Sequence, residues 1–392
     1  MTILIVTGIF PPDIGGPATY VPLIAGALAS RGHQVKVLTT SEPEDLGYDD
    51  RQYPFPVVRL NRRLPLWRRT FTLIRLIIQH GREADLIYAN GMYLETALAN
   101  KLLRKPLVVK IVGDEAWERA TRKGWTRDGF EEFQSKRQPW PAELNKWQRA
   151  WAIGQADRVI VPSRYLKRIV TQWGIPEERC AVVYNAVQTE NSENTTCPEN
   201  GPAIFQGKLR LVTVGRLIPL RNLPLILQAI ARLPETTLTV IGDGPCFTEW
   251  LNQTEKLGLK NRVRFLGSQP STAVRKLLRH HDIFVLASSH EGFPHSVLEA
   301  MEAELAVVAT AVGGTPEVVE DGQNGLLVPP NDEEALYQAL ARLTNDTKLR
   351  NRLAQKGRKT VEAKFTTETM INKTEAVLEK AVKPFISKDT DK

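Results

Sequence analysis

Two glutamates at a fixed spacing offer the clearest chemistry in this sequence. Glu291 and Glu299 stand eight residues apart behind an apolar run at 283–286, so Glu291 is expected in a loop and Glu299 in the helix that begins near 294–296. Carboxylates accept hydrogen bonds from vicinal hydroxyls, so one could hold a hexose and the other a ribose. The helix start between them offers backbone N–H groups to a phosphate. Apolar neighbours predict that Glu299 is buried and needs partners; the alternative is an ordinary surface glutamate.

Two arginines follow another apolar run, 209–214. Arg216 and Arg221 flank Pro219 at a spacing of five residues, so both guanidinium groups could converge on one diphosphate. The planar guanidinium fork suits phosphate oxygens better than a lysine ammonium does. The alternative is a turn that carries two exposed arginines.

A glycine pair, Gly15 and Gly16, stands between the first apolar run, 2–7, and a helical pattern at 18–31. Glycines in such a loop let the backbone approach a ligand closely, and the start of a helix favours an anion. The spacing does not match the dinucleotide motif G-x-G-x-x-G. Taken alone, the loop is better explained as a tight turn without a ligand.

Strand-like runs recur along the whole chain, and helical patterns lie between them. The runs are continuous in Val, Ile and Leu, which is typical of strands covered on both faces. Strand, helix and strand in succession predict parallel sheets, whose ligands bind at the carboxyl ends of the strands. The predicted strands are 2–7, 34–39, 86–89, 107–112, 158–161, 181–184, 209–214, 237–241, 263–266, 283–286, 306–310 and 325–328.

The strands divide into two sets of six at a break in composition. The 392 residues exceed one ordinary domain, so we expect two doubly wound α/β domains, at 1–187 and 208–365. Residues 188–207 are rich in Thr, Asn, Glu, Pro and Gly and predict a linker. Residues 366–385 open with a threonine cap and predict an amphipathic C-terminal helix.

Composition argues against several classes of protein. The longest apolar runs have eight or nine residues and are too short to cross a bilayer. The N-terminus lacks the basic start of a signal peptide. Three widely spaced cysteines, Cys180, Cys197 and Cys246, suit a reducing compartment and predict neither a disulfide framework nor a zinc site. A cytoplasmic location is therefore expected.

The formal net charge of +8 falls entirely in residues 1–187, which hold 27 basic and 19 acidic residues. Such a field would attract nucleic acid, a membrane surface or a phosphorylated substrate. The alternative is a solvated basic face without a partner. Between Asp50 and Glu83 no acid occurs, and the arginines there are Arg51, Arg59, Arg62, Arg63, Arg68, Arg69, Arg75 and Arg82.

The same stretch also carries apolar residues at helical spacing. Trp67 and Phe71 beside arginines are typical of an interfacial helix that binds anionic lipid peripherally. The competing explanation is that Leu73, Ile74 and Ile77 pack on a sheet while the arginines face water.

Taken in order, the motifs resemble the family 4 glycosyltransferases across nearly the whole chain. The resemblance implies the GT-B fold, with two facing Rossmann-like doubly wound domains and a C-terminal helix that returns to the N-terminal domain. The matching segments are Phe10-Pro11-Pro12, Gly15-Gly16, 185–187, Gly215-Arg216 with Arg221, 241–245, the E-x7-E motif of Glu291 and Glu299, 310–317 and 321–328.

The resemblance also implies an activity. A hexosyl group would pass from a nucleotide-diphosphate sugar to an acceptor hydroxyl, with retention of anomeric configuration and without metal or other cofactor. The product would belong to glycan, polysaccharide or glycolipid synthesis, and no nucleic-acid partner is expected. A lipid-linked acceptor would suit an enzyme bound peripherally to the inner face of the cytoplasmic membrane.

Carried over residue by residue, the resemblance assigns Arg216 and Arg221 to the diphosphate, Glu299 to the ribose and Glu291 to the donor hexose. Gly16 would close over the donor from the N-terminal domain. The other donor-site residues implied are Gly15, Gly215, Gly242, Gly244, Phe293, Pro294, His295, Ser296 and Val297.

The loop after the fourth strand departs from the family pattern. Many members carry a histidine there, whereas this chain has Val112 followed by Gly113 and Asp114. Asp114 is our candidate for the polar group on the acceptor side, and it joins Glu291, Arg216 and Arg221 as a predicted catalytic residue.

Two other functions fit part of the sequence. A sugar-nucleotide epimerase can share the same scaffold, so the fold alone does not exclude it. A nucleic-acid-binding protein would account for the basic N-terminal half, in which arginines and aromatic residues interleave.

Overall fold

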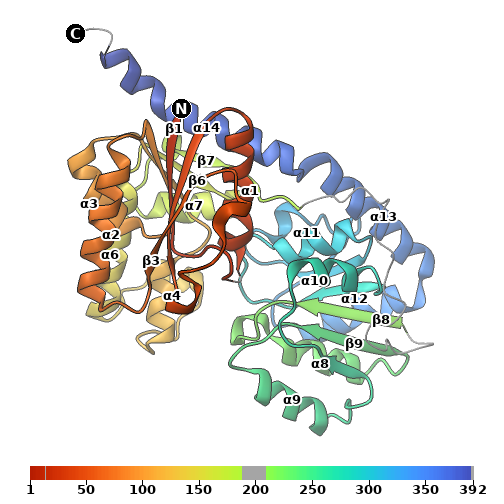
Figure 1. Cartoon of the computed structure of the whole chain (residues 1–392). Coiled ribbons are helices and arrows are strands. Elements are labelled where there is room, and N and C mark those ends of the chain that lie inside the picture. Colours follow the sequence, from red (N-terminus) through yellow and green to blue (C-terminus); the bar gives the residue numbers. More distant parts are fainter. Residues whose placement is uncertain (14, 188–208, 390–392) are drawn as a thin grey trace. The chain divides into compact units, whose positions relative to one another are not determined.

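The computed structural model describes residues 1–13, 15–187 and 209–389, with side chains described up to residue 383. The chain forms two compact units (Figure 1): Met1–Val183 with Met370–Lys392, and Tyr184–Thr369. The predicted linker, 188–207, lies outside the described residues.

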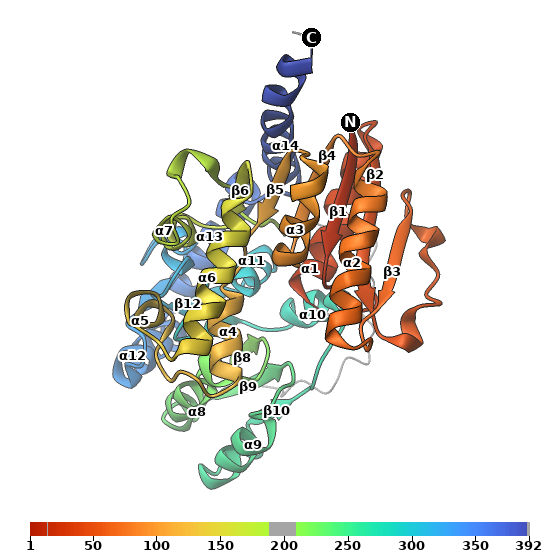
Figure 2. The same ribbon diagram turned by 90° about the vertical axis from the view of Figure 1, so that its left-hand side faces the viewer.

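The N-terminal unit is a seven-stranded parallel sheet in the order β3-β2-β1-β4-β5-β6-β7. Helices α2, α3 and α6 lie side by side in one layer (Figure 2), while α1 packs against β1 and β2. The elements are β1 (Thr2–Thr7), α1 (Gly16–Ser30), β2 (Gln34–Ser41), β3 (Val57–Asn61), α2 (Leu66–Gly81), β4 (Leu86–Asn90), α3 (Tyr93–Leu103), β5 (Leu107–Lys110), α4 (Glu115–Arg122), α5 (Phe130–Ser135), α6 (Trp140–Gly154), β6 (Arg158–Val161), α7 (Arg164–Gln172) and β7 (Cys180–Val182).

The second unit is a six-stranded parallel sheet in the order β10-β9-β8-β11-β12-β13. Its elements are β8 (Leu209–Val214), α8 (Leu223–Ala231), β9 (Thr236–Ile241), α9 (Phe247–Lys256), β10 (Val263–Phe265), α10 (Ser271–Leu278), β11 (Ile283–Leu286), α11 (His295–Glu302), β12 (Ala306–Thr310), β13 (Leu326–Val328), α12 (Glu333–Asn345) and α13 (Thr347–Lys364).

Alternate residues of these strands bury against two different helix layers. Ile283 and Val285 of β11 join a core cluster with α8, α9 and α12. Phe284 and Leu286 join a second cluster with α10 and α11. Both faces of the sheet are therefore apolar, which explains the continuous Val, Ile and Leu runs of the sequence.

The final helix, α14 (Thr367–Asp389), joins the N-terminal unit from Met370 onward. Glu375 pairs with Arg31, and its Oε1 lies 2.8 Å from His33 Nε2. Thr374 Oγ1 lies 3.5 Å from the hydroxyl of Tyr20 on α1. The C-terminal helix thus returns to the N-terminal domain, as the fold prediction states.

Each predicted strand has a counterpart in the structure, but the prediction of six strands in the N-terminal half was wrong. The seventh strand is β3, at the edge of the sheet beside β2. It is only half-buried, and Arg59 interrupts its apolar pattern, so the segment lacks the signal of a strand covered on both faces.

Candidate active site

Two glycine-containing loops meet at the carboxyl ends of β8 and β9. A Cβ atom at Gly242, where φ is +141°, would lie 1.9 Å from the carbonyl oxygen of Gly215. A Cβ atom at Gly244 would lie 2.4 Å from the carbonyl oxygen of Leu217. The backbone N–H of Leu217 in turn donates to the Asp243 carbonyl at 2.9 Å. The loops therefore pack backbone against backbone, which only glycine permits at these positions.

Arg221 crosses from this pair of loops to the loop after β11. It ends a short 3-10 helix (Pro219–Arg221), and its side chain packs on Gly215, where a Cβ would lie 3.1 Å from Nε. Its Nη1 donates to Ser288 Oγ at 3.2 Å and forms an ion pair with Glu291 Oε1. Nε and Nη2 carry further N–H groups, so a guanidinium bound to Glu291 can also bind phosphate oxygens.

Glu291 is a buried carboxylate with 7% of its surface exposed. Burial raises its pKa, whereas the positive charge of Arg221 and the hydrogen bond from Ser288 oppose that shift. The Gly314 N–H donates to the Glu291 carbonyl at 2.9 Å, so the loop after β12 holds its backbone in place. Arg221 and Glu291, 70 residues apart in sequence, are thus brought together by adjacent strands.

Helix α11 begins at His295, directly after this loop. The ring of Phe293 stacks on Tyr184, with centroids 5.6 Å apart, and His295 Nε2 lies 3.1 Å from the Ala186 carbonyl oxygen. Pro294 and Val297 are buried, whereas Ser296 is only partly so.

Glu299, one turn further along α11, has a side chain that is 17% exposed, with Oε1 3.6 Å from His295 Nδ1. The carboxylate is therefore largely buried, as its apolar neighbours predict. Arg216, by contrast, is exposed, and within the described ranges no ion pair is formed by its guanidinium. It remains available to an anion.

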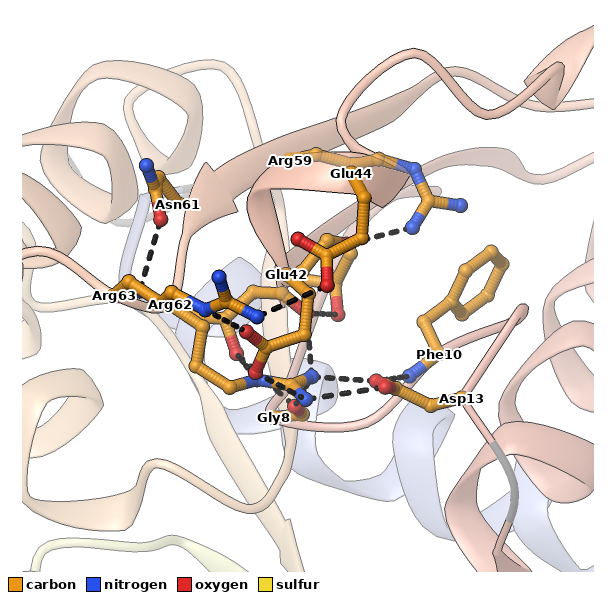
Figure 3. Close-up of polar contacts among 12 residues, drawn as sticks. Gly8, Phe10, Asp13, Glu42, Glu44, Arg59, Asn61, Arg62 and Arg63 are labelled. Atoms are coloured by element: carbon orange, nitrogen blue, oxygen red, sulfur yellow. Dashed lines mark hydrogen bonds and ion pairs between the residues drawn. The ribbon is translucent and has the colours of Figure 1, made fainter.

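The glycine loop of the N-terminal unit is held by arginines (Figure 3). Gly15 caps α1, and a Cβ at Gly16 would meet no atom within 4 Å. Arg62 donates to the carbonyls of Gly8 at 3.1 Å and Thr40 at 2.9 Å, and it pairs with Asp13. These contacts fix the loop before the helix.

Ion pairs also neutralise part of the basic stretch at 51–82. Arg59 pairs with Asp50, and Arg63 pairs with Glu42 and Glu44. Arg51 and Arg62 also have acidic partners, so four of the eight arginines are neutralised by acids outside the stretch. The positive field is therefore smaller than the sequence alone indicates.

The α2 helix has two distinct faces. Leu73 and Ile77 are buried, whereas Leu66, Trp67 and Phe71 are each 68–69% exposed. The helix thus buries one face on the N-terminal unit and also presents aromatic side chains to solvent. Across the described helices, none is both long and apolar enough to span a bilayer.

Asp114, predicted on the acceptor side, has a fully buried side chain. It caps α4 by accepting from the Ala116 N–H at 2.9 Å, accepts from Gln134 Nε2 at 2.8 Å and pairs with Arg149. With these partners it offers no exposed surface to an acceptor. Val112, in the position where relatives often carry histidine, is 42% exposed.

Comparisons with known proteins agree with this architecture. Residues 199–360 match the family model for glycosyl transferases group 1, and residues 14–191 match that for glycosyltransferase family 4. The structure of Anabaena Alr3699/HepE in complex with UDP superposes with a TM-score of 0.77 at 23% identity, covering 97% of this chain and 100% of that one.

Two curated relatives are similar over parts of the chain. The lipopolysaccharide core biosynthesis glycosyltransferase LpsE of Rhizobium meliloti (strain 1021) is 34% identical over 160 residues, which are 41% of this chain and 46% of LpsE. A Campylobacter jejuni enzyme, N-acetylgalactosamine-N,N'-diacetylbacillosaminyl-diphospho-undecaprenol 4-alpha-N-acetylgalactosaminyltransferase, is 28% identical over 56% of this chain and 60% of its own length. With both halves matched by glycosyltransferase models and the predicted fold confirmed, the chain belongs to the family 4 glycosyltransferases.

Proposed function

We propose that the chain transfers a hexosyl group from a nucleotide-diphosphate sugar to an acceptor hydroxyl, with retention and without a metal ion. The observation that carries the proposal is a cluster in which Arg221, from the loop after β8, meets Ser288 and Glu291, from the loop after β11. It offers guanidinium donors for a diphosphate beside a carboxylate for sugar hydroxyls.

The charges of this cluster suit the departure of a nucleoside diphosphate. As the glycosidic bond breaks, negative charge grows on the leaving phosphate, and Arg216 and Arg221 would stabilise it. The N-terminus of α11 adds N–H groups on the same side of the sheet. In this arrangement Glu291 and Glu299 would position the hexose and the ribose.

The test is a transfer assay with a panel of nucleotide-diphosphate sugars and a glycoside library as acceptors. The anomeric coupling constant of the product, measured by NMR, should equal that of the donor, and activity should survive EDTA. An inverted product would contradict retention, and loss of activity restored by a divalent cation would contradict metal independence.

We further propose that the enzyme works at an anionic membrane surface, with α2 as the contact. Trp67 and Phe71 project into solvent, and Arg68, with its guanidinium 5.0 Å over the Trp67 ring, and Arg75 are exposed nearby. Aromatic residues beside arginines favour the headgroup region of anionic lipid. LpsE and the Campylobacter enzyme are named for lipopolysaccharide and undecaprenol-linked products, which supports a membrane-borne acceptor.

Co-sedimentation with vesicles tests this second proposal. The chain should sediment with anionic vesicles at low salt and remain soluble with neutral ones, because each arginine near the surface contributes about 1 kcal/mol. Replacing Trp67 and Phe71 by serine should abolish sedimentation. Trp140→Ser, which removes an equally exposed tryptophan from α6, should not. Equal sedimentation of all variants would refute the role of α2.

A further inference from the structure

The N-terminal unit contains a cavity that no predicted site residue accounts for. It has a volume of about 110 Å³, lies between α3, α4 and α6, and reaches the loops that follow β4 and β5. Ligands of parallel sheets bind at these carboxyl ends. Met92, at the cavity wall, has a left-handed backbone with φ of +53°, a strained conformation that clusters at functional sites.

Part of the cavity lining is polar. Glu95 comes from α3, Glu115 and Arg119 from α4, and Gln148 from α6. Asn145, also on the wall, accepts a hydrogen bond from Arg119 Nη1 at 3.0 Å. Carboxylates accept hydrogen bonds from hydroxyls, and side-chain amides both accept hydrogen bonds and donate them.

Apolar side chains complete the lining, so the cavity is amphipathic. Sugar rings combine hydroxyls at the edge with C–H groups on the face, and a mixed lining can contact both. The volume exceeds that of a single water site several-fold, as a ring requires. The apolar lining comprises Met92, Leu94, Ile111, Ala116, Ala152 and Ile153.

The charges on the wall nearly cancel. Arg149 is paired with the buried Asp114, which leaves Glu95, Glu115 and Arg119. The guanidinium of Arg149 also lies 3.8 Å from the centroid of the Trp173 ring, which belongs to the same wall. Because the pKa of Glu115 is raised to about 7, this carboxyl group is only partly ionised near neutral pH, and the wall carries a small net charge that suits a neutral ligand.

Among the residues of the cavity wall, Glu115 is the best suited to form hydrogen bonds with a ligand hydroxyl. Although much of the residue is exposed, its carboxyl group is crowded by protein atoms and lies close to Glu118 and Glu95; this raises its pKa to about 7, with Arg119 opposing the shift. Near neutral pH it can therefore both donate and accept a hydrogen bond.

We propose that the α3–α4–α6 cavity binds a neutral pyranose ring of the acceptor and that Glu115 is a specificity residue in it. The acceptor role rests on the glycosyl transfer proposed above. Asp114 is then a positioning residue, because it fixes α4 and Arg149 behind the cavity without touching the ligand.

The test uses the full chain and four probes: methyl glucopyranoside and methyl N-acetylglucosaminide, which are neutral, methyl glucuronide, which is anionic, and methyl glucosaminide, which is cationic. Binding is followed by saturation-transfer NMR, and UDP affinity is measured in parallel. Glu115→Ala, which removes both the donor and the acceptor, should weaken the neutral probes at least tenfold, with Glu178→Ala as the matched control. Gln148→Trp should fill the cavity and abolish binding, whereas Gln155→Trp, at the exposed end of the same helix, should not.

Thermal melts that match the wild type would show that the N-terminal unit of each variant remains folded. The proposal is overturned if no neutral probe binds, if only a charged probe binds, or if Gln148→Trp leaves binding intact. The glycoside titrations test the cavity, and the UDP titration tests the proposed donor site. Failure of the wild type to bind UDP would therefore count against the donor site and not against the cavity.

Discussion

Gly313→Ala should damage the candidate active site through the backbone alone. Gly313 has φ of +56°, and a Cβ atom there would lie 1.8 Å from the carbonyl oxygen of Glu291. Contact at that distance is impossible, so the loop carrying Glu291 must shift by more than an ångström. Gly322 provides the matched control: its φ is +67°, and a Cβ would meet nothing within 4 Å.

The two variants separate the cost of conformation from the cost of the clash. An alanine in the left-handed region costs about 1–2 kcal/mol at either position. Overpacking adds about 1–3 kcal/mol at Gly313 only. For a unit of this size each kcal/mol lowers Tm by about 2–4 °C, so Gly313→Ala should melt about 2–12 °C below Gly322→Ala.

Turnover should follow the same order. A displacement of about 1 Å at a reacting group can lower the rate by about 100-fold, so Gly313→Ala should lose most activity well below its Tm. Gly322→Ala should retain it. Thermal melts and initial rates measured side by side decide the matter, and equal Tm values with equal turnover would refute the contact between the two loops.

Two further predictions concern polar side chains with several partners. Arg62→Lys cannot donate to the Gly8 carbonyl, the Thr40 carbonyl and Asp13 at once, so it should lower the free energy of unfolding by about 1–3 kcal/mol. Arg63→Lys, on an exposed ion pair, should change it by less than about 1 kcal/mol in the same urea titrations. Burial lowers the pKa of His281 to about 4, from 6.5, so the folded chain holds it neutral and stability is lost as pH falls from 6.5 to 4. The free energy of unfolding should fall by about 3 kcal/mol over this pH range. This decrease should be smaller in His281→Phe and unchanged in His280→Gln. If the stability of the two variants depends on pH in the same way, His281 is not responsible.

The sheets were predictable because their signal is local. A strand buried on both faces needs a continuous apolar run, and β1, β11 and β12 have one. The edge strand β3 needs apolar residues on one side only, and Arg59 serves as a partner of Asp50 and of the Pro11 carbonyl. A short strand with such an arginine has no distinctive pattern.

The meeting of Arg221 and Glu291 was predictable for a related reason. Each lies in the loop that follows a strand, and adjacent parallel strands bring such loops together. The surroundings of Asp114 were not predictable, because its partners Gln134 and Arg149 lie 20 and 35 residues away on different helices. Arg62 and Arg63 likewise depend on distant acids, Asp13 for the first and Glu42 and Glu44 for the second, which the sequence lists but does not pair.

The measurement that tests the central claim most directly is calorimetric titration of the chain with the nucleoside diphosphate of its preferred donor in the transfer assay. If Arg216 and Glu299 bind the nucleotide, losing either charge-assisted contact removes about 1.5–3 kcal/mol, so Arg216→Ala and Glu299→Ala should each weaken the binding of this nucleotide about 10- to 150-fold. Arg352→Ala, an exposed arginine on α13, should leave the affinity unchanged. Wild-type affinity in both Arg216→Ala and Glu299→Ala would contradict the assignment of the nucleotide site.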